Sequence, residues 1–211
     1  MIHKVKNTFD RNMKVVGLDL AAIEQRPSGF CVFDDFTART EILFSNVKIV
    51  NKILEVQPIL VAIDAPLSLP NGRRSLSEKI GPHMRKSEKE LLKRKIRIFP
   101  ITLGPMRKLT ERGMALRKRL QLENIRVIEV YPGGAQDVLN IPRKKKGLDG
   151  LRLGLQKLGI KGLNDDMSDH ELDAVTCALV GKLFLDGESI SYGDPAEGTI
   201  EMPKDISISR K

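Results

Sequence analysis

Short apolar runs alternate along the chain with segments of helical periodicity. Apolar runs rich in β-branched residues predict strands, and apolar residues spaced three and four apart predict helices. The predicted strands are residues 14–21, 29–34, 40–45, 59–66 and 125–132. The predicted helices are residues 47–56, 87–96, 104–120, 148–160 and 169–186, and a turn with a short strand follows at 192–203. This order predicts an α/β protein in which an antiparallel three-strand meander continues into a mixed sheet.

The segment after the fourth predicted strand differs from the rest in charge. Residues 73–119 contain 16 Lys or Arg residues against 4 Asp or Glu, whereas the net charge of the whole chain is +9. We interpret residues 67–104 as a basic, partly helical insertion within a single domain of residues 14–205. Residues 1–13 and 206–211 are expected to be terminal tails. The basic segment favours a polyanionic partner such as nucleic acid.

Composition argues against some classes of binding surface and against membrane association. The chain has 211 residues, of which 41% are hydrophobic, enough to bury a core of its own. Trp is absent and there are two Tyr residues, which argues against a stacking platform for single-stranded nucleic acid. Both cysteines lie in apolar runs and are expected to be reduced, as in a cytoplasmic protein. No apolar run is long enough to cross a membrane, so no membrane association is expected. The sequence leaves open whether the chain forms a homodimer.

Three aspartates lie in apolar sequence, where an unpaired carboxylate is costly. Asp19 occurs in V-V-G-L-D-L-A, Asp64 in I-L-V-A-I-D-A-P and Asp173 in H-E-L-D-A-V-T-C-A-L. Taken singly, Asp19 could form a turn at a strand end. Asp64 could likewise cap a turn before Pro66. Each therefore has a structural interpretation as well as a functional one.

At the start of the last predicted helix, some polar residues have a structural explanation and Asp173 does not. Ser168 and Glu171 have the spacing of a capping box, and Asp169 complements the helix dipole. Asp173 lies beyond the first turn and shares a face with His170. That face continues through the small residues Ala174, Cys177, Ala178 and Gly181. It is therefore predicted to pack closely on the sheet, with Asp173 directed at the sheet end.

Together the three aspartates predict a metal site. If the strands of Asp19 and Asp64 are parallel neighbours, the two residues meet at one sheet edge about 4.8 Å apart. Two carboxylates at about 5 Å repel by about 3 kcal/mol, so a cation or bound protons must compensate. Oxygen ligands favour Mg²⁺ or Mn²⁺. Two such ions can activate water and stabilise the leaving oxygen in phosphodiester hydrolysis.

These stretches, with V-A-I-D-A-P-L-S-L-P-N-G-R, V-I-E-V-Y-P and G-D-P-A-E-G-T-I-E-M-P, resemble the RNase H-like superfamily. Within it the chain resembles an uncharacterised family of predicted nucleases, domain of unknown function 429, distantly similar to RuvC-type resolvases. The resemblance implies a five-stranded mixed sheet of order 3-2-1-4-5 flanked by helices. It places Asp19, Asp64 and Asp173 at positions that bind metal in nucleases of this fold. His170 matches the acid or His that precedes the final Asp of resolvases by three. The long basic insertion departs from the resolvase pattern.

Other charged residues have open interpretations. Glu129 is expected on the strand beside that of Asp64, as either a fourth metal ligand or a solvent-facing strand-end residue. The run R-K-K-K at 143–146 could contact phosphate or form a solvated loop. Arg85 and Glu88 match a family pattern whose role the sequence does not give.

The favoured hypothesis is a Mg²⁺- or Mn²⁺-dependent nuclease acting on DNA or RNA. Its predicted metal ligands are Asp19, Asp64, Asp173 and Glu129, with His170 joining the three aspartates as a catalytic residue. One alternative is a non-catalytic nucleic-acid-binding or scaffold protein on the same fold. Another is a nucleotide-handling enzyme of the actin and sugar-kinase type. The second alternative is disfavoured because no Gly-rich phosphate-binding motif follows Asp19.

Overall fold

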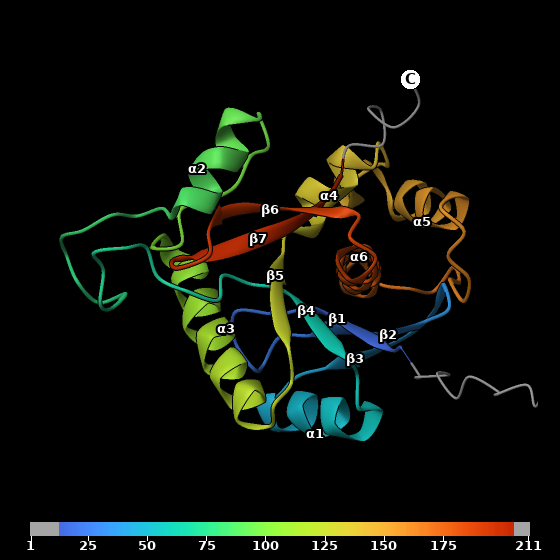
Figure 1. Cartoon of the computed structure of the whole chain (residues 1–211). Coiled ribbons are helices and arrows are strands. Elements are labelled where there is room, and N and C mark those ends of the chain that lie inside the picture. The colour runs from blue at the N-terminus through green and yellow to red at the C-terminus, as the bar shows by residue number, and fades with distance from the viewer. Residues whose placement is uncertain (1–12, 205–211) are drawn as a thin grey trace, which may run out of the picture.

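A seven-stranded mixed sheet forms the centre of the molecule (Figure 1). The computed structural model describes residues 13–204, and its sheet has the order β3-β2-β1-β4-β5-β7-β6. The strands are β1 (Val15–Asp19), β2 (Ser28–Asp34), β3 (Thr37–Leu43), β4 (Leu60–Asp64), β5 (Val127–Val130), β6 (Ser189–Asp194) and β7 (Gly198–Pro203). Strands β1, β4, β5 and β7 run parallel, whereas β2, β3 and β6 pair antiparallel with their neighbours.

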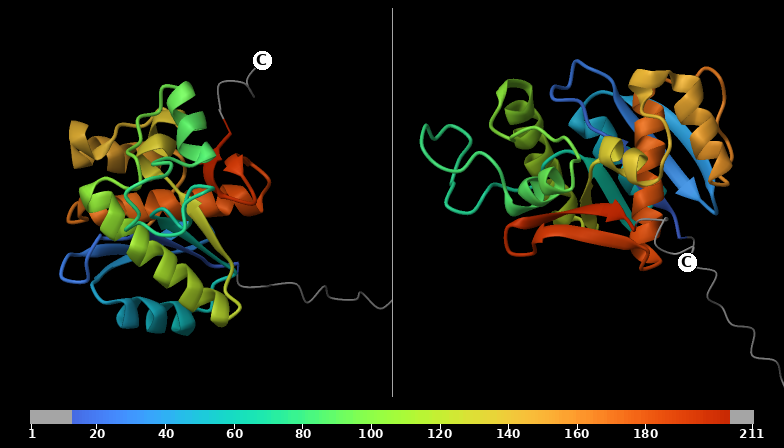
Figure 2. Two further views of the ribbon diagram at one scale, coloured as in Figure 1. Left: turned by 90° about the vertical axis from the view of Figure 1, so that its left-hand side faces the viewer. Right: turned by 90° about the horizontal axis from the view of Figure 1, so that it is seen from above.

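Helices cover both faces of the sheet, as the two further views in Figure 2 show. They are α1 (Asn46–Val56), α2 (Lys86–Lys93), α3 (Gly104–Leu122), α4 (Pro132–Val138), α5 (Leu148–Lys157) and α6 (Asp169–Leu185), with a 3-10 turn η1 (Lys144–Lys146). Apolar residues of α1 and α3 pack with β1 and β4 in one core cluster. Residues of α5 and α6 pack with β1 and β2 in another, on the opposite face. In the described part of the chain no helix is both long and apolar enough to cross a membrane.

The predicted five-strand order 3-2-1-4-5 is confirmed, and so is the RNase H-like arrangement of strands and flanking helices. The sheet is larger than expected because residues 189–203 form a hairpin, β6 and β7, that extends it beyond β5. Strand β6 was not predicted, since Tyr192 is its one buried residue and the alternation in S-I-S-Y-G-D is weak. Of the predicted tails, residues 1–13 and 206–211, all but Met13 lie outside the described residues.

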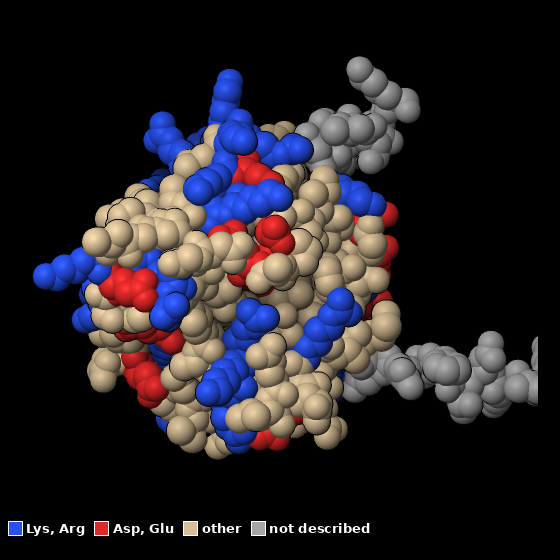
Figure 3. Space-filling view, turned by 60° about the vertical axis from the view of Figure 1, so that its left-hand side comes forward, with Lys and Arg blue, Asp and Glu red and all other residues tan. Residues whose placement is uncertain are grey.

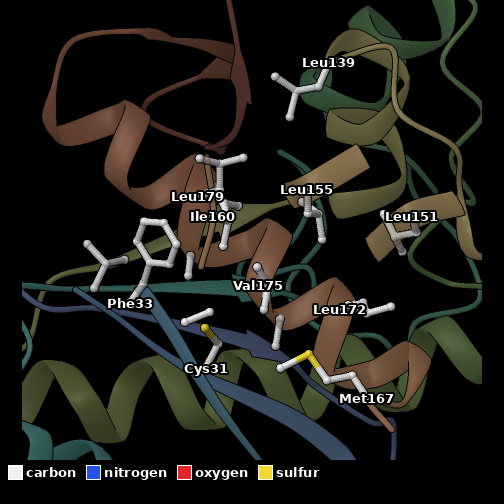
Figure 4. Close-up of a cluster of buried hydrophobic side chains, with 14 residues drawn as sticks. Cys31, Phe33, Leu139, Leu151, Leu155, Ile160, Met167, Leu172, Val175 and Leu179 are labelled. Atoms are coloured by element: carbon white, nitrogen blue, oxygen red, sulfur yellow. The ribbon is translucent and has the colours of Figure 1, made fainter. Parts of the chain in front are cut away.

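Helix α6 packs directly on the sheet through its small residues, as predicted. A Cβ atom added to Gly17 of β1 would lie 2.0 Å from the carbonyl oxygen of Ala174. One added to Gly29 of β2 would lie 1.9 Å from the carbonyl oxygen of His170. The glycines therefore let the helix approach the strands backbone to backbone. Figure 4 shows the buried side chains that pack around this contact, mostly aliphatic but including Cys31, Phe33 and Met167. The register of α6 on the sheet fixes where its N-terminal residues lie.

The basic insertion contains one helix, α2, which is shorter than the predicted segment 87–96. Much of the remainder is loop, held to the sheet by polar contacts. The Glu197 carboxylate, in the β6–β7 turn, accepts hydrogen bonds from the backbone N–H groups of Asn71 (2.7 Å) and Lys86 (2.6 Å). The Arg73 guanidinium donates to four backbone carbonyls of the loop. The hairpin therefore anchors the insertion to the sheet.

Helix α4 was not predicted, because Gly133 and Gly134 disfavour a helix on propensity. Close packing explains Gly134: a Cβ there would lie 2.7 Å from the Tyr131 ring and 2.8 Å from the terminal methyl group of Met202. Tertiary contacts thus override local propensity at this position.

Candidate active site

Asp19 and Asp64 lie side by side at the carboxyl ends of two neighbouring parallel strands. Asp19 ends β1, Asp64 ends β4, and the two are register partners. The predicted parallel pairing therefore brings these two acids to one edge of the sheet. Asp19 is nine-tenths buried and Asp64 is partly buried.

Asp64 is the least compensated of the acids. Within residues 13–204 its carboxylate makes no salt bridge, and none of the side-chain hydrogen bonds involves it. Burial raises the pKa of Asp64 well above its ordinary value, and the charges of Asp19 and Asp173 raise it further. An acid in this condition favours a bound proton or a bound cation.

The N-terminal part of α6 supplies the next two predicted residues. The capping box is present: Ser168 Oγ accepts from the Glu171 N–H (3.3 Å), and Glu171 accepts from the Ser168 N–H (2.9 Å). One turn on, Asp173 is 5% exposed and its Oδ1 accepts from Gln136 Nε2 of α4 at 2.8 Å. His170 Nδ1 lies 2.7 Å from Asp19 Oδ2, and this hydrogen bond raises the pKa of His170. The structure thus brings Asp19, Asp64, Asp173 and His170 together.

A cation that sequence reasoning did not place at the site comes from η1. Lys144 Nζ lies 2.8 Å from Asp173 Oδ2 and 3.1 Å from Asp169 Oδ2. Burial lowers the pKa of Lys144, but the charge of Asp173 and its hydrogen bond outweigh that effect and raise the pKa overall. Of the run R-K-K-K, Lys145 and Lys146 are exposed, as in a solvated loop, whereas Lys144 is held at the acids by two salt bridges. The clustering of four cations was the available signal, but nothing in the sequence pairs Lys144 with α6.

Glu129 has a different set of partners. Its side chain is 6% exposed, so the solvent-facing interpretation is wrong. Glu129 Oε2 accepts from Arg85 Nη1 at 2.7 Å and from the backbone N–H of Leu67 at 2.8 Å, and Oε1 also pairs with Arg85. Arg85, fully buried, also pairs with Glu88. A role for Glu129 as a metal ligand would require it to release Arg85.

The donor set can be tested against the predicted divalent ions. Asp19, Asp64 and Asp173 offer carboxylate oxygens, the ligands that Mg²⁺ and Mn²⁺ prefer. The uncompensated charge of Asp64 fits such an ion. In the described residues no group of three or more His, Cys, Asp or Glu side chains already has the arrangement of a metal site. The residues therefore fit the ions by chemistry, and ligation by Asp173 Oδ2 would displace the Lys144 ammonium.

A cavity of about 580 Å³ opens beside these acids. Asp64 and Asp173 line one end of it. The rest of its wall is mainly basic and aromatic, from the end of the insertion, the start of α4 and the segment around η1. These residues include Lys95, Arg97, Phe99, Tyr131, Arg143, Lys144 and Lys145.

A sequence profile described as "Protein of unknown function (DUF429)" matches residues 17–198. The chain belongs to this family. In this DUF429 protein the matched range includes β1 with Asp19, the end of β4 with Asp64, and α6 with Asp173 and His170. No curated protein sequence matches the chain.

Solved structures similar to this DUF429 protein include two of RuvC from Thermus thermophilus. One, described as RuvC in complex with Holliday junction substrate, is 13% identical, with a TM-score of 0.46. The alignment covers 82% of this chain and 94% of that chain. The other, described as the Thermus thermophilus RuvC structure, is 14% identical, with a TM-score of 0.47. That alignment covers 83% of this chain and 97% of that chain.

Proposed function

We propose that this protein is a metal-dependent nuclease that hydrolyses phosphodiester bonds of DNA or RNA at Asp19, Asp64 and Asp173. The single observation that supports the proposal most strongly is the state of Asp64. It lies at a strand end beside Asp19, within the electrostatic influence of Asp173, and forms no salt bridge with any residue of 13–204. An acidic site kept uncompensated in this way costs stability, which a functional ligand would offset.

The three aspartates would divide the two metal ions between them. Asp19 and Asp64 would hold one divalent ion and Asp173 the second, and the ions would supply an activated water and stabilise the leaving oxygen. His170 fixes the orientation of Asp19 through the hydrogen bond to Oδ2. Gln136 fixes Asp173 in the same way through Oδ1. These neighbouring hydrogen bonds orient candidate ligands, as outer-shell partners do in known metal sites.

The charge around the site suits a polyanionic substrate. Five cationic side chains line the cavity beside the acids: Lys95, Arg97, Arg143, Lys144 and Lys145. Figure 3 shows further Lys and Arg side chains spread over one face of the molecule, with fewer acidic groups among them. Such a surface attracts nucleic-acid phosphates in a salt-dependent way. The predicted nucleic-acid partner is therefore part of this proposal.

Replacement of Asp19 by Asn tests the proposal. We expect Asp19→Asn to abolish Mn²⁺-dependent cleavage of fluorescently labelled oligonucleotides. The circular dichroism spectrum should be unchanged and the unfolding transition should stay cooperative. The matched control is Asp186→Asn. Asp186 follows the other end of α6, where it pairs with Lys182, and its loss should leave cleavage unchanged. Cleavage at the wild-type rate by Asp19→Asn protein would refute the assignment.

A further inference from the structure

We propose that the cavity beside Asp64 and Asp173 binds one unpaired nucleotide, so that the substrate is single-stranded nucleic acid rather than an intact duplex. This inference rests on the proposed nuclease function and names its substrate class. A cavity of about 580 Å³ lies within the range that encloses small ligands. It can enclose one nucleotide but not a stack of paired bases. Enzymes that act in such pockets take single-stranded or extruded nucleotides.

One wall of the cavity comes from residues 95–99, where Lys95 closes the turn after α2 with a positive φ of 65° and residues 96–99 extend from it without helix or strand structure. In K-I-R-I-F, residues 95–99, Ile96 and Ile98 pack into the core cluster of β6 and β7. The intervening residues Lys95, Arg97 and Phe99 line the cavity. The segment thus presents two cations and one aromatic ring to the cavity. Phe99 is 69% exposed, an unusual position for a large apolar ring unless something covers it.

A second aromatic ring lines the same cavity in a fixed position. The Tyr131 hydroxyl donates to the backbone carbonyl of Arg97 at 2.7 Å and accepts from Arg143 Nη1 at 3.2 Å. Tyr131 therefore ties the segment 95–99 to the start of α4. The two rings offer apolar faces to a base, and stacking of this kind tolerates any base. The low Tyr and Trp content argued against an extended stacking platform, but a site for one base needs no more than these rings.

The cavity also has cationic side chains that are free to bind the phosphates on either side of the bound nucleotide. Arg143 pairs with Asp137, and Lys144 pairs with Asp173 and Asp169. In contrast, Lys95, Arg97 and Lys145 form no salt bridge with any residue of 13–204. Unpaired cations on two sides of an aromatic-lined cavity are suited to a polynucleotide backbone entering and leaving it.

The test measures binding in EDTA, where no cleavage takes place. Fluorescence anisotropy compares a short single strand with the blunt duplex of the same sequence, as DNA and as RNA. We expect the single strand to bind more tightly. Phe99→Ala should weaken that binding about tenfold, the effect of losing one stacked base. Leu122→Ala is the matched control, because Leu122 is also 69% exposed but lies at the end of α3, outside the cavity lining.

An abasic strand separates stacking from charge. Wild-type protein should prefer the strand with bases over the same backbone without them, and Phe99→Ala should lose this preference. The double variant Lys95→Gln, Arg97→Gln should keep the preference but bind both strands more weakly and with a shallower salt dependence. Equal affinity for single strand and duplex, or a base preference that survives Phe99→Ala, would overturn the inference. Failure of the nuclease proposal is a different result: selective single-strand binding in EDTA with no cleavage when Mn²⁺ is added.

Discussion

Two groups of charged residues meet at adjacent strands, each contributing one acid from its strand, and differ in how their charge is compensated. The arginine cluster consists of Arg85, Glu88 and Glu129, and Glu129 lies on β5. The aspartate cluster consists of Asp19, Asp64 and Asp173 with His170 and Lys144, and Asp64 ends β4. Strands β4 and β5 are paired neighbours, with Ile63 opposite Glu129. Similar acids therefore lie almost side by side in two different electrostatic states.

The arginine cluster is satisfied from within the protein. Arg85 Nε, Nη1 and Nη2 make five hydrogen bonds, to Glu88, Glu129 and Ser68. Burial would lower the pKa of Arg85, but the charges of Glu129 and Glu88 raise it overall. The aspartate cluster has one lysine, which contacts Asp173 and Asp169 and leaves Asp64 without a partner. The comparison separates acids that a protein cation pairs directly from Asp64, which has no such partner and for which the proposed function supplies a metal ion.

The largest expected effect is loss of the arginine cluster. Arg85→Met leaves Glu88 and Glu129 buried without their cation, and breaking such a buried pair costs about 3–5 kcal/mol. Urea unfolding followed by circular dichroism would measure the loss. The control is Arg119→Met, which removes the exposed pair with Glu123 on α3 and should cost about 1 kcal/mol or less. Equal stability of the two variants would show that Arg85 is not the structural counter-ion of these acids.

The five strands of the core, the face of α6 that meets the sheet and the convergence of the aspartates could be predicted because they depend on short sequence patterns and on chain direction. Apolar runs that contain Asp19 and Asp64 near their ends, joined through two antiparallel strands and one helix, indicate parallel strands with both acids at one edge. Small residues on α6 indicated the face that meets the sheet, and this face carries Asp173 and His170. Predicting where the aspartates meet therefore required only the hydrophobic periodicity and the direction of each strand, which short sequence segments indicate.

The compensating cations could not be predicted, because they depend on loop paths. Lys144 reaches Asp173 from a 3-10 turn, and Arg85 reaches Glu129 from the insertion across 44 residues of sequence. Apolar periodicity says nothing about where such segments return to the sheet. The sequence left two interpretations of Glu129 open for this reason: its strand was predicted, but its partner Arg85 comes from the insertion.

A smaller effect is expected at Lys144. Lys144→Met removes the positive charge beside Asp173, so the metal-free protein should lose about 1 kcal/mol of stability, as for a partly exposed pair. Since the ammonium no longer competes for Asp173, the variant should bind Mn²⁺ more tightly in isothermal titration. Lys145→Met is the control, because Lys145 lies on the same turn without a salt bridge among the described residues. Equal Mn²⁺ affinity of the two variants would contradict competition between Lys144 and the ion.

An effect of similar size but of opposite sign is expected at Asp64. Asp64→Asn removes a charge that burial and the charges of Asp19 and Asp173 disfavour, while the amide keeps the shape of the side chain. We expect the metal-free variant to be more stable by about 1 kcal/mol, a rise in Tm of about 3 °C. Differential scanning calorimetry in EDTA would measure it.

The control for Asp64→Asn is Asp166→Asn, since Asp166 is exposed and its carboxylate has no partner in residues 13–204; its Tm should not change. Addition of Mn²⁺ should reverse the order, because the wild-type protein gains stability from the bound ion and the Asp64→Asn variant gains less. A destabilised Asp64→Asn protein in EDTA would mean that the wild-type carboxylate is already compensated. The two clusters would then differ only in which cation serves them, and the aspartate cluster would need no ligand from outside the chain.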